Sequence, residues 1–179
     1  DMRPAYQEYR TWLQVMLHHR PARQLVLKCP EHLWFTDALL DVFPDACIIW
    51  THRDPVASVA SYCSMMALTR RFIYGRFEPE EMGPYIAERF WQGVSRAMEV
   101  RDRPGRSANF FDADFTELTA DPGRVLSAAA EHFGLEGLDP QRIAAWQQGD
   151  REDKQGRYVY SPEAFGVDRD AVHNRKSVV

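Results

Sequence analysis

Arg53 stands where a short apolar run gives way to a helix start, and this position suits an anion-binding residue. The run at 47–50 is apolar and flanked by polar residues, which predicts a buried strand. Pro55 fits the first helical turn because its ring fixes φ and its missing N–H would have no partner there, and Asp54 is the natural N-cap. A guanidinium beside the free N–H groups of a helix N-terminus favours anions, and phosphate is the anion expected here.

Ser58 and Ser61 follow on the predicted helix, one and two turns in. Either hydroxyl is able to add a neutral hydrogen bond to the same anion. The alternative is a solvated Arg53 on an ordinary strand-to-helix turn, with serines that bond back to helical carbonyls. The residues alone leave both interpretations open.

Helices and strands alternate along the rest of the sequence. Apolar residues at three- and four-residue spacing predict helices, and short apolar runs predict strands. The expected helices cover residues 3–20, 31–43, 55–70, 80–101, 121–134 and 140–147, and the expected strands cover 24–27, 46–51 and 109–111. Gly83 and Pro84 predict a break or a late start in the long helix. A loop-rich tail over 149–179 completes a single domain of residues 1–179.

Strands separated by helices predict an α/β fold in which a parallel sheet is flanked by helices, giving three layers. Ligands of such sheets bind at the carboxyl ends of the strands. Lys28, Arg53 and Asp112 each follow an expected strand, so we expect them at one edge of the sheet, where they suit a charged, nucleotide-like ligand. The alternative is that every α/β protein has polar residues at its strand ends.

The composition of the chain limits the kinds of partner and the compartment that we expect for it. The 179 residues carry a net charge of −4 and are 45% hydrophobic, which indicates a folded domain with no expected nucleic-acid or membrane partner. No signal peptide and no apolar stretch of about 18 residues is present. Cys29, Cys47 and Cys63 are expected as buried free thiols of a reducing compartment, which favours a cytoplasmic location. Cys29 and His32 have a C-x-x-H spacing without a second pair of ligands, so no metal is expected.

Four segments, spread over most of the chain, carry a resemblance to a known family. They are LVLKCPEHL at 25–33, VFPDACIIWTHRDPVASVASYCSM at 42–65, FFDADFTELTADPGRVL at 110–126 and RYVYSPEAFGVD at 157–168. They resemble bacterial sulfotransferases that use 3′-phosphoadenosine-5′-phosphosulfate (PAPS). The resemblance implies a P-loop NTPase-like sulfotransferase fold with PAPS as co-substrate. In this family an arginine after the strand and a serine on the next helix bind the 3′-phosphate, and the matching residues are Arg53 and Ser61.

The resemblance also implies roles for Lys28 and His32. The segment around Lys28 is similar to the family's lysine-containing strand end, so Lys28 would stabilise charge on the sulfuryl group or its bridging oxygen. His32 is the expected base for the acceptor proton, because its unperturbed pKa lies near neutrality. The alternative for His32 is a helix N-terminal residue satisfied by the backbone. Lys154 and Arg157 are expected to close over the nucleotide, and the alternative is a tail folded loosely on the core.

One part of the family pattern is missing from the sequence. Members have, upstream, a strand followed by a Gly-rich, Ser/Thr-containing loop that binds the 5′-phosphosulfate. No segment before Lys28 matches it. Either the chain is the carboxy-terminal portion of a longer enzyme, which the start at Asp1 favours, or the 5′ site has been lost. We therefore expect partial or no activity from this chain alone. If the family's sheet places the missing strand centrally, the strands at 46–51 and 109–111 also lack their shared neighbour.

Three functions remain to be separated. The first is a sulfotransferase, or part of one, that moves a sulfuryl group from PAPS to a hydroxyl or amine of a small-molecule, glycan or peptide acceptor. The second is a P-loop-like nucleotide kinase or other phosphotransferase, which predicts a G-x-x-x-x-G-K-[ST] motif that is absent. The third is a non-catalytic nucleotide-binding or interaction domain derived from a sulfotransferase. The sequence specifies neither the acceptor nor the oligomeric state.

Overall fold

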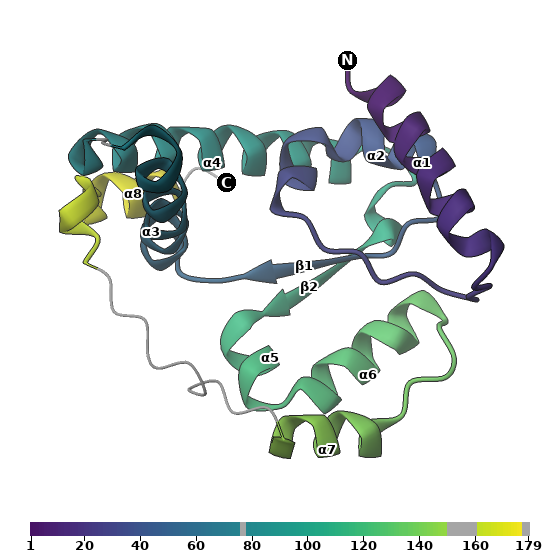
Figure 1. Cartoon of the computed structure of the whole chain (residues 1–179). Coiled ribbons are helices and arrows are strands. Elements are labelled where there is room, and N and C mark those ends of the chain that lie inside the picture. The colour runs from purple at the N-terminus through teal and green to yellow at the C-terminus, as the bar shows by residue number, and fades with distance from the viewer. Residues whose placement is uncertain (76–77, 150–160, 177–179) are drawn as a thin grey trace. The chain divides into compact units, whose positions relative to one another are not determined.

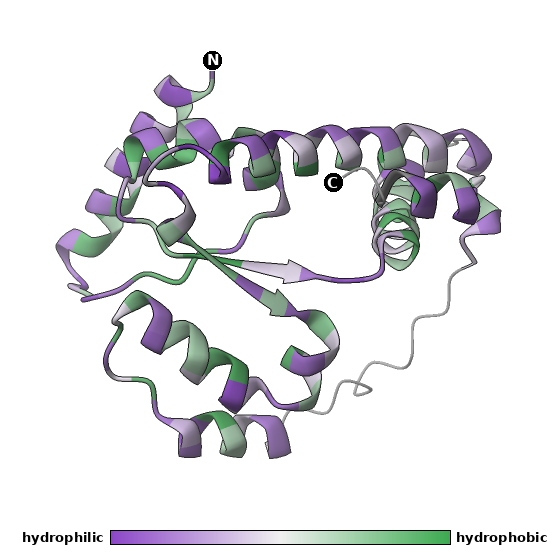
Figure 2. Cartoon of the chain, turned by 180° about the vertical axis from the view of Figure 1, so that it is seen from behind, coloured by the Kyte–Doolittle hydropathy of each residue, from purple (hydrophilic) through white to green (hydrophobic). Residues whose placement is uncertain are grey.

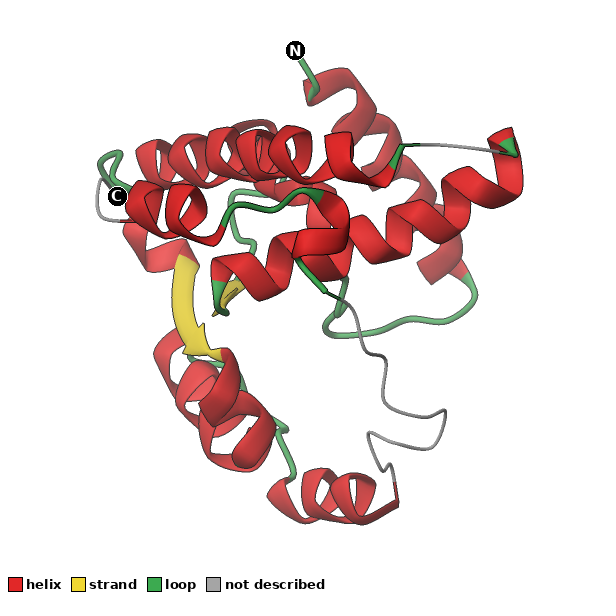
Figure 3. Cartoon of the chain, turned by 90° about the vertical axis from the view of Figure 1, so that its left-hand side faces the viewer, coloured by secondary structure: helices red, strands yellow, loops and turns green. Residues whose placement is uncertain are grey.

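The computed structural model describes residues 1–75, 78–149 and 161–176. The described chain is mainly helical and contains two strands (Figure 1, Figure 3). In chain order the elements are α1 (Arg3–His18), η1 (Pro30–Phe35), α2 (Thr36–Val42), β1 (Ile48–His52), α3 (Pro55–Tyr74), α4 (Pro79–Arg101), η2 (Ser107–Asn109), β2 (Phe110–Asp114), α5 (Phe115–Ala120), α6 (Pro122–Phe133), α7 (Pro140–Gly149), η3 (Glu163–Phe165) and α8 (Arg169–Lys176), where η marks a 3₁₀ helix.

The chain divides into two compact units. The first unit combines residues 1–47 with 92–109, and the second unit combines residues 48–91 with 110–179. Helix α4 contributes its first part to the second unit and its last part to the first.

The core of the first unit lies between α1 and α2. Tyr6 of α1 packs with Ala38 and Val42 of α2, and all three residues are buried. Helix α1 buries one face, and its ribbon alternates hydrophilic and hydrophobic stretches (Figure 2). Trp34 of η1 lies against Gly93 of α4, where an added Cβ would come within 2.8 Å of the indole Nε1. Glycine at this position therefore lets helix and indole approach closely.

The second unit is built around two parallel strands. β1 and β2 pair from Ile48 opposite Phe110 to His52 opposite Asp114. Helix α6 packs on β2 and on α5. A separate buried cluster joins α3 to α4 and to the segment after η3, and its members are Val56, Val59, Cys63, Met82, Ile86 and Val167. Helix α3 therefore supplies half of the six residues in this buried cluster.

A proline inside α4 coincides with a close backbone contact. Pro84 cannot donate to the carbonyl of Glu80, four residues earlier, because it has no N–H. Gly166, which ends η3 with φ of 64°, passes so close to that carbonyl that a Cβ would clash with it. The helix nevertheless continues through Gly83 and Pro84, so the predicted break is wrong.

Several sequence predictions are confirmed by the structure. The α/β class with parallel strands is present. The expected helices form with small changes of boundary, except that the 31–43 helix is a 3₁₀ turn followed by α2. Asp54 caps α3 by accepting the N–H of Ala57 at 2.7 Å. Asp121 caps α6 in the same way, and Gly134 ends that helix with φ of 63°.

The predicted strand at 24–27 is wrong, because these residues adopt no regular structure. Val26 is 97% exposed, and its neighbours Leu25 and Leu27 are also exposed. A strand forms where a neighbouring backbone satisfies its N–H and C=O groups, and in the described part of the chain β1 and β2 pair with each other instead. Because β1 and β2 pair directly, no missing strand lies between them, so the expectation of a lost central neighbour is wrong.

Other differences concern the second strand, the tail and the cysteines. β2 runs to Asp114, so Asp112 lies within the strand and not after it. Helices α5 and α8 were not predicted. Cys29 and Cys47 are exposed, and only Cys63 is a buried thiol as expected.

Candidate functional site

Arg53 follows β1 directly and lies at the carboxyl end of the parallel pair. Its guanidinium carbon is 4.9 Å from the centroid of the Phe115 ring, at the start of α5. An aromatic face at this distance attracts a cation and supports its planar group from one side. The strand end, α5 and the start of α3 thus determine where this charge lies.

The N-terminus of α3 begins two residues after Arg53. Ser58 donates its hydroxyl to the carbonyl of Asp54 at 2.9 Å. This is the bond back to a helical carbonyl that the sequence left as an alternative, and it occupies the Ser58 hydroxyl proton. Ser61 is half-buried on the second turn of α3.

Two histidine–aspartate pairs surround this strand end, and neither was predicted. His52 Nε2 lies 2.7 Å from Asp112 Oδ1 across the strand pair. His173 Nε2 of α8 lies 3.1 Å from Asp54 Oδ2. The parallel register explains the first pair, since His52 is opposite Asp114 and so diagonal to Asp112 on the same face. No signal in the sequence identified the second pair, because it joins residues from distant segments.

In the first unit, His32 is held by a tyrosine. The Tyr6 hydroxyl and His32 Nδ1 are 2.8 Å apart. The rings of Tyr6 and Tyr9 lie 5.7 and 6.4 Å from the imidazole, so two aromatic side chains of α1 flank it. Burial lowers the pKa of His32, opposed by the charge of Glu31, and burial raises the pKa of Tyr6 to about 12. Both side chains are therefore neutral at pH 7.

Lys28 and Cys29 precede His32 on the exposed segment that enters η1. The Cys29 thiol donates to Glu31 Oε2 at 2.9 Å, and this hydrogen bond is the main reason why the pKa of Cys29 is raised. The thiol is accordingly protonated and a poor nucleophile.

The structure distributes the expected site residues over the two units. Lys28 and His32 belong to the first unit, and Arg53 and Ser61 belong to the second. Lys154 and Arg157 lie outside the described residues.

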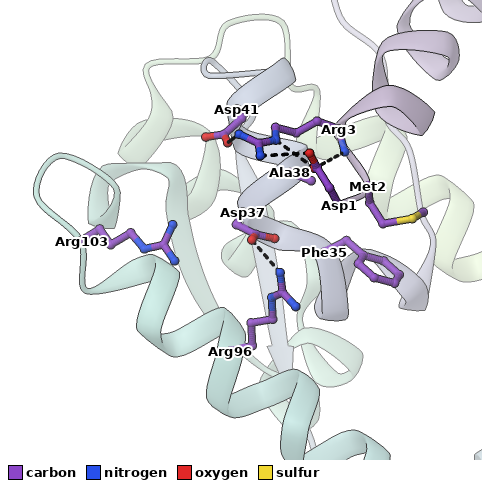
Figure 4. A pocket seen from close by; sticks show the side chains of 9 residues that line it. All are labelled: Asp1, Met2, Arg3, Phe35, Asp37, Ala38, Asp41, Arg96 and Arg103. Carbon is purple, nitrogen blue, oxygen red and sulfur yellow. Dashed lines mark hydrogen bonds and ion pairs between the residues drawn. The ribbon is translucent and has the colours of Figure 1, made fainter.

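A cavity of about 340 Å³ in the first unit lies between α2, the end of α4 and the chain start (Figure 4). Arg96 donates to Asp37 Oδ2 at 2.7 Å, while Asp37 Oδ1 is buried without a hydrogen-bond partner among the described residues. Burial would raise the pKa of Asp37, but the bonds from Arg96 and the Ala38 N–H, with the charge of Arg103, lower it overall. Acidic and basic side chains alternate in the lining, so the cavity favours neither sign of ligand charge.

Comparison with known proteins identifies the family. The carboxyl end of a parallel strand, followed by a helix N-terminus, is where many α/β proteins bind phosphate-containing ligands. The sequence matches the model of the sulfotransferase family over residues 1–140, and the chain belongs to this family. Comparison with curated protein sequences finds no match.

Two solved structures are similar to the chain. Sulfotransferase STF9 from Mycobacterium avium has a TM-score of 0.86 and 27% identity, covering 99% of this chain and 46% of that protein. Sulfotransferase STF1 from Mycobacterium tuberculosis H37Rv has a TM-score of 0.67 and 30% identity, covering 86% of this chain and 39% of that protein. The chain thus spans less than half the length of these sulfotransferases. In the described part of the chain, no helix has the length and apolar character needed to cross a membrane.

Proposed function

We propose that this chain is the part of a PAPS-dependent sulfotransferase that holds the 3′-phosphate end of the nucleotide. The observation that carries the proposal is the placement of Arg53 at the carboxyl end of β1, against Phe115 and beside the capped N-terminus of α3. A guanidinium suits a phosphate because its N–H groups match the phosphate oxygens in a bidentate arrangement. Ser61 would add a neutral hydrogen bond from α3.

Lys28 and His32 are proposed as the residues nearest the reacting groups. In sulfuryl transfer the acceptor oxygen forms a bond to sulfur as the bond from sulfur to the bridging phosphate oxygen breaks, and the acceptor loses its proton. Such a reaction depends on in-line placement and on stabilising charge at the leaving oxygen. The Lys28 ammonium would supply that charge. An imidazole such as His32 is able to accept the proton or to donate a hydrogen bond, and its tautomer decides which.

The acceptor is proposed to be a hydroxyl or amine on a small molecule, glycan or peptide, with Lys154 and Arg157 adding positive charge to the nucleotide site. The 179 residues contain no Gly-rich, Ser/Thr-containing loop for the 5′-phosphosulfate. We therefore propose that the chain alone binds the nucleotide through its 3′-phosphate and transfers sulfuryl weakly or not at all.

Titration calorimetry with two nucleotides tests this function. Adenosine-3′,5′-bisphosphate carries the 3′-phosphate, and adenosine-5′-monophosphate lacks it. A charge-assisted contact of about 1.5–3 kcal/mol predicts roughly 10- to 150-fold tighter binding of the bisphosphate. Equal affinity for the two nucleotides would contradict the proposal.

A further inference from the structure

The contact between Tyr6 and His32 determines which nitrogen of the imidazole is left for a ligand. Nδ1 faces the tyrosine hydroxyl at 2.8 Å, so Nε2 is the nitrogen not engaged by this bond. Tyr6 is 6% exposed, whereas His32 is only half-buried. The ring is therefore held at Nδ1 by a buried hydroxyl, while the residue as a whole remains partly exposed.

The direction of this hydrogen bond follows from the donors and acceptors available on the phenol and the imidazole. A tyrosine hydroxyl has one proton to donate, and a neutral imidazole has one N–H and one acceptor nitrogen. Among the described residues, His32 Nδ1 is the hydrogen-bond partner found for the Tyr6 hydroxyl. If Nδ1–H donated to the oxygen instead, the phenolic proton would be left in a buried region with no hydrogen-bond partner among the described residues, which costs free energy.

The surroundings of Tyr6 and His32 favour the uncharged form of both side chains. The phenol remains protonated because burial, with smaller contributions from Cys29, Asp37 and Tyr9, raises its pKa to about 12. Burial keeps the imidazole neutral near pH 7, although the charge of Glu31 acts in the opposite direction. With both groups neutral, the hydroxyl proton and the imidazole lone pair form one well-matched bond.

We propose that Tyr6 is a positioning residue that donates to Nδ1 of His32, fixes the imidazole as the Nε2–H tautomer, and makes His32 a hydrogen-bond donor toward the ligand. The inference rests on the proposed function, in which His32 lies beside the sulfuryl group. A donor there would bind an oxygen of the sulfuryl group or of the phosphate that leaves. It would not take the acceptor proton, since Nε2 already carries one. This assigns His32 a role different from the base that its residue type suggested.

The tautomer can be observed directly in the unaltered chain by NMR of the ¹⁵N-labelled imidazole. We expect His32 Nδ1 to resonate as an unprotonated nitrogen and Nε2 as a protonated one at neutral pH. The reverse assignment, or an even mixture of the two tautomers, would overturn the proposal. Because this measurement needs no nucleotide, it stands whether or not the chain binds PAPS.

The Tyr6→Phe variant gives a second, independent test, through the direction in which the pKa of His32 changes. A bond donated to Nδ1 stabilises the neutral ring, so its loss should raise the pKa of His32. A bond accepted from Nδ1–H would stabilise the imidazolium, and its loss would lower that pKa. Tyr9→Phe is the matched control, since the Tyr9 ring flanks the same imidazole at 6.4 Å. A pKa of His32 that falls in Tyr6→Phe, or that moves equally in both variants, would contradict the assignment.

Sulfuryl transfer by the protein with its complete nucleotide site distinguishes a donor role of His32 from a base role. The side-chain amide of Gln retains an N–H donor but cannot serve as a base near neutral pH. A donor role predicts that His32→Gln keeps at least tenfold more sulfuryl transfer than His32→Ala. Equal loss in the two variants would contradict the donor role. Absence of transfer in the unaltered protein would instead count against the proposed function.

Discussion

His173 Nε2 lies 3.1 Å from Asp54 Oδ2, so α8 is tied to the residue that caps α3 and follows Arg53. One carboxylate thereby serves two purposes, because its other oxygen accepts the N–H of Ala57. The start of α3 and the tail helix are linked at the strand end where we propose that phosphate binds.

Replacing Asp54 should loosen both α3 and α8. Asp54→Ala removes an N-cap, which typically costs about 1 kcal/mol of unfolding free energy, and also removes the partner of His173. His173→Ala should cost only a few tenths of a kcal/mol, because the two side chains are 48% and 51% exposed. Hydrogen exchange should show faster exchange in α8 for Asp54→Ala. Asp121→Ala removes the cap of α6 and serves as the control. Equal exchange of α8 in the two cap variants would argue against the link.

Gly166 is expected to tolerate substitution worse than a glycine of similar backbone conformation. Gly166→Ala places a methyl group at φ of 64° and against the carbonyl of Glu80. Gly134 has a φ of 63°, and a new methyl group there would meet open space. Gly134→Ala therefore measures only the cost in unfolding free energy of placing alanine at a positive φ. We expect about 1 kcal/mol of destabilisation for Gly134→Ala and roughly 1–3 kcal/mol more for Gly166→Ala. Urea denaturation measures both, and similar losses would show that the contact with Glu80 is unimportant.

The three thiols should react at two different rates. Cys29 and Cys47 are exposed, while Cys63 is buried and its pKa is raised by burial to about 11. The pKa values of Cys29 and Cys47 are also raised, by the hydrogen bond to Glu31 and by partial burial respectively, so both react slowly for exposed thiols. A disulfide reagent at pH 8 should still modify these two cysteines in the folded chain and Cys63 only after unfolding, because Cys63 is also shielded from the reagent. Cys63→Ala should leave the fast reaction unchanged. A folded chain with three equally reactive thiols would contradict the burial of Cys63.

The local elements were largely predictable from the sequence. Asp54 with Pro55, and Asp121 with Pro122, each combine a cap with a first-turn proline, and both helices begin there. These signals act within a few residues and need no distant partner. The position of Arg53 after β1 was predictable for the same reason.

Features that depend on distant segments were not predictable. The run at 24–27 has the composition of a strand, yet composition cannot supply a neighbouring backbone for pairing. His32 was proposed from the resemblance of the 25–33 segment to the sulfotransferase family, but Tyr6, which contacts its Nδ1, comes from a distant helix. His173 likewise contacts Asp54 from more than 100 residues away, as the separation of 119 shows.

The central claim is that Arg53 binds the 3′-phosphate, and calorimetry of Arg53→Ala with adenosine-3′,5′-bisphosphate tests it most directly. Loss of this charge-assisted contact should cost about 2 kcal/mol, or roughly thirtyfold in affinity. Arg124→Ala is the matched control, since Arg124 is an exposed arginine of the same unit that pairs with Glu117. We expect the control to bind like the unaltered chain. Binding of equal strength by Arg53→Ala and the unaltered chain would contradict the account.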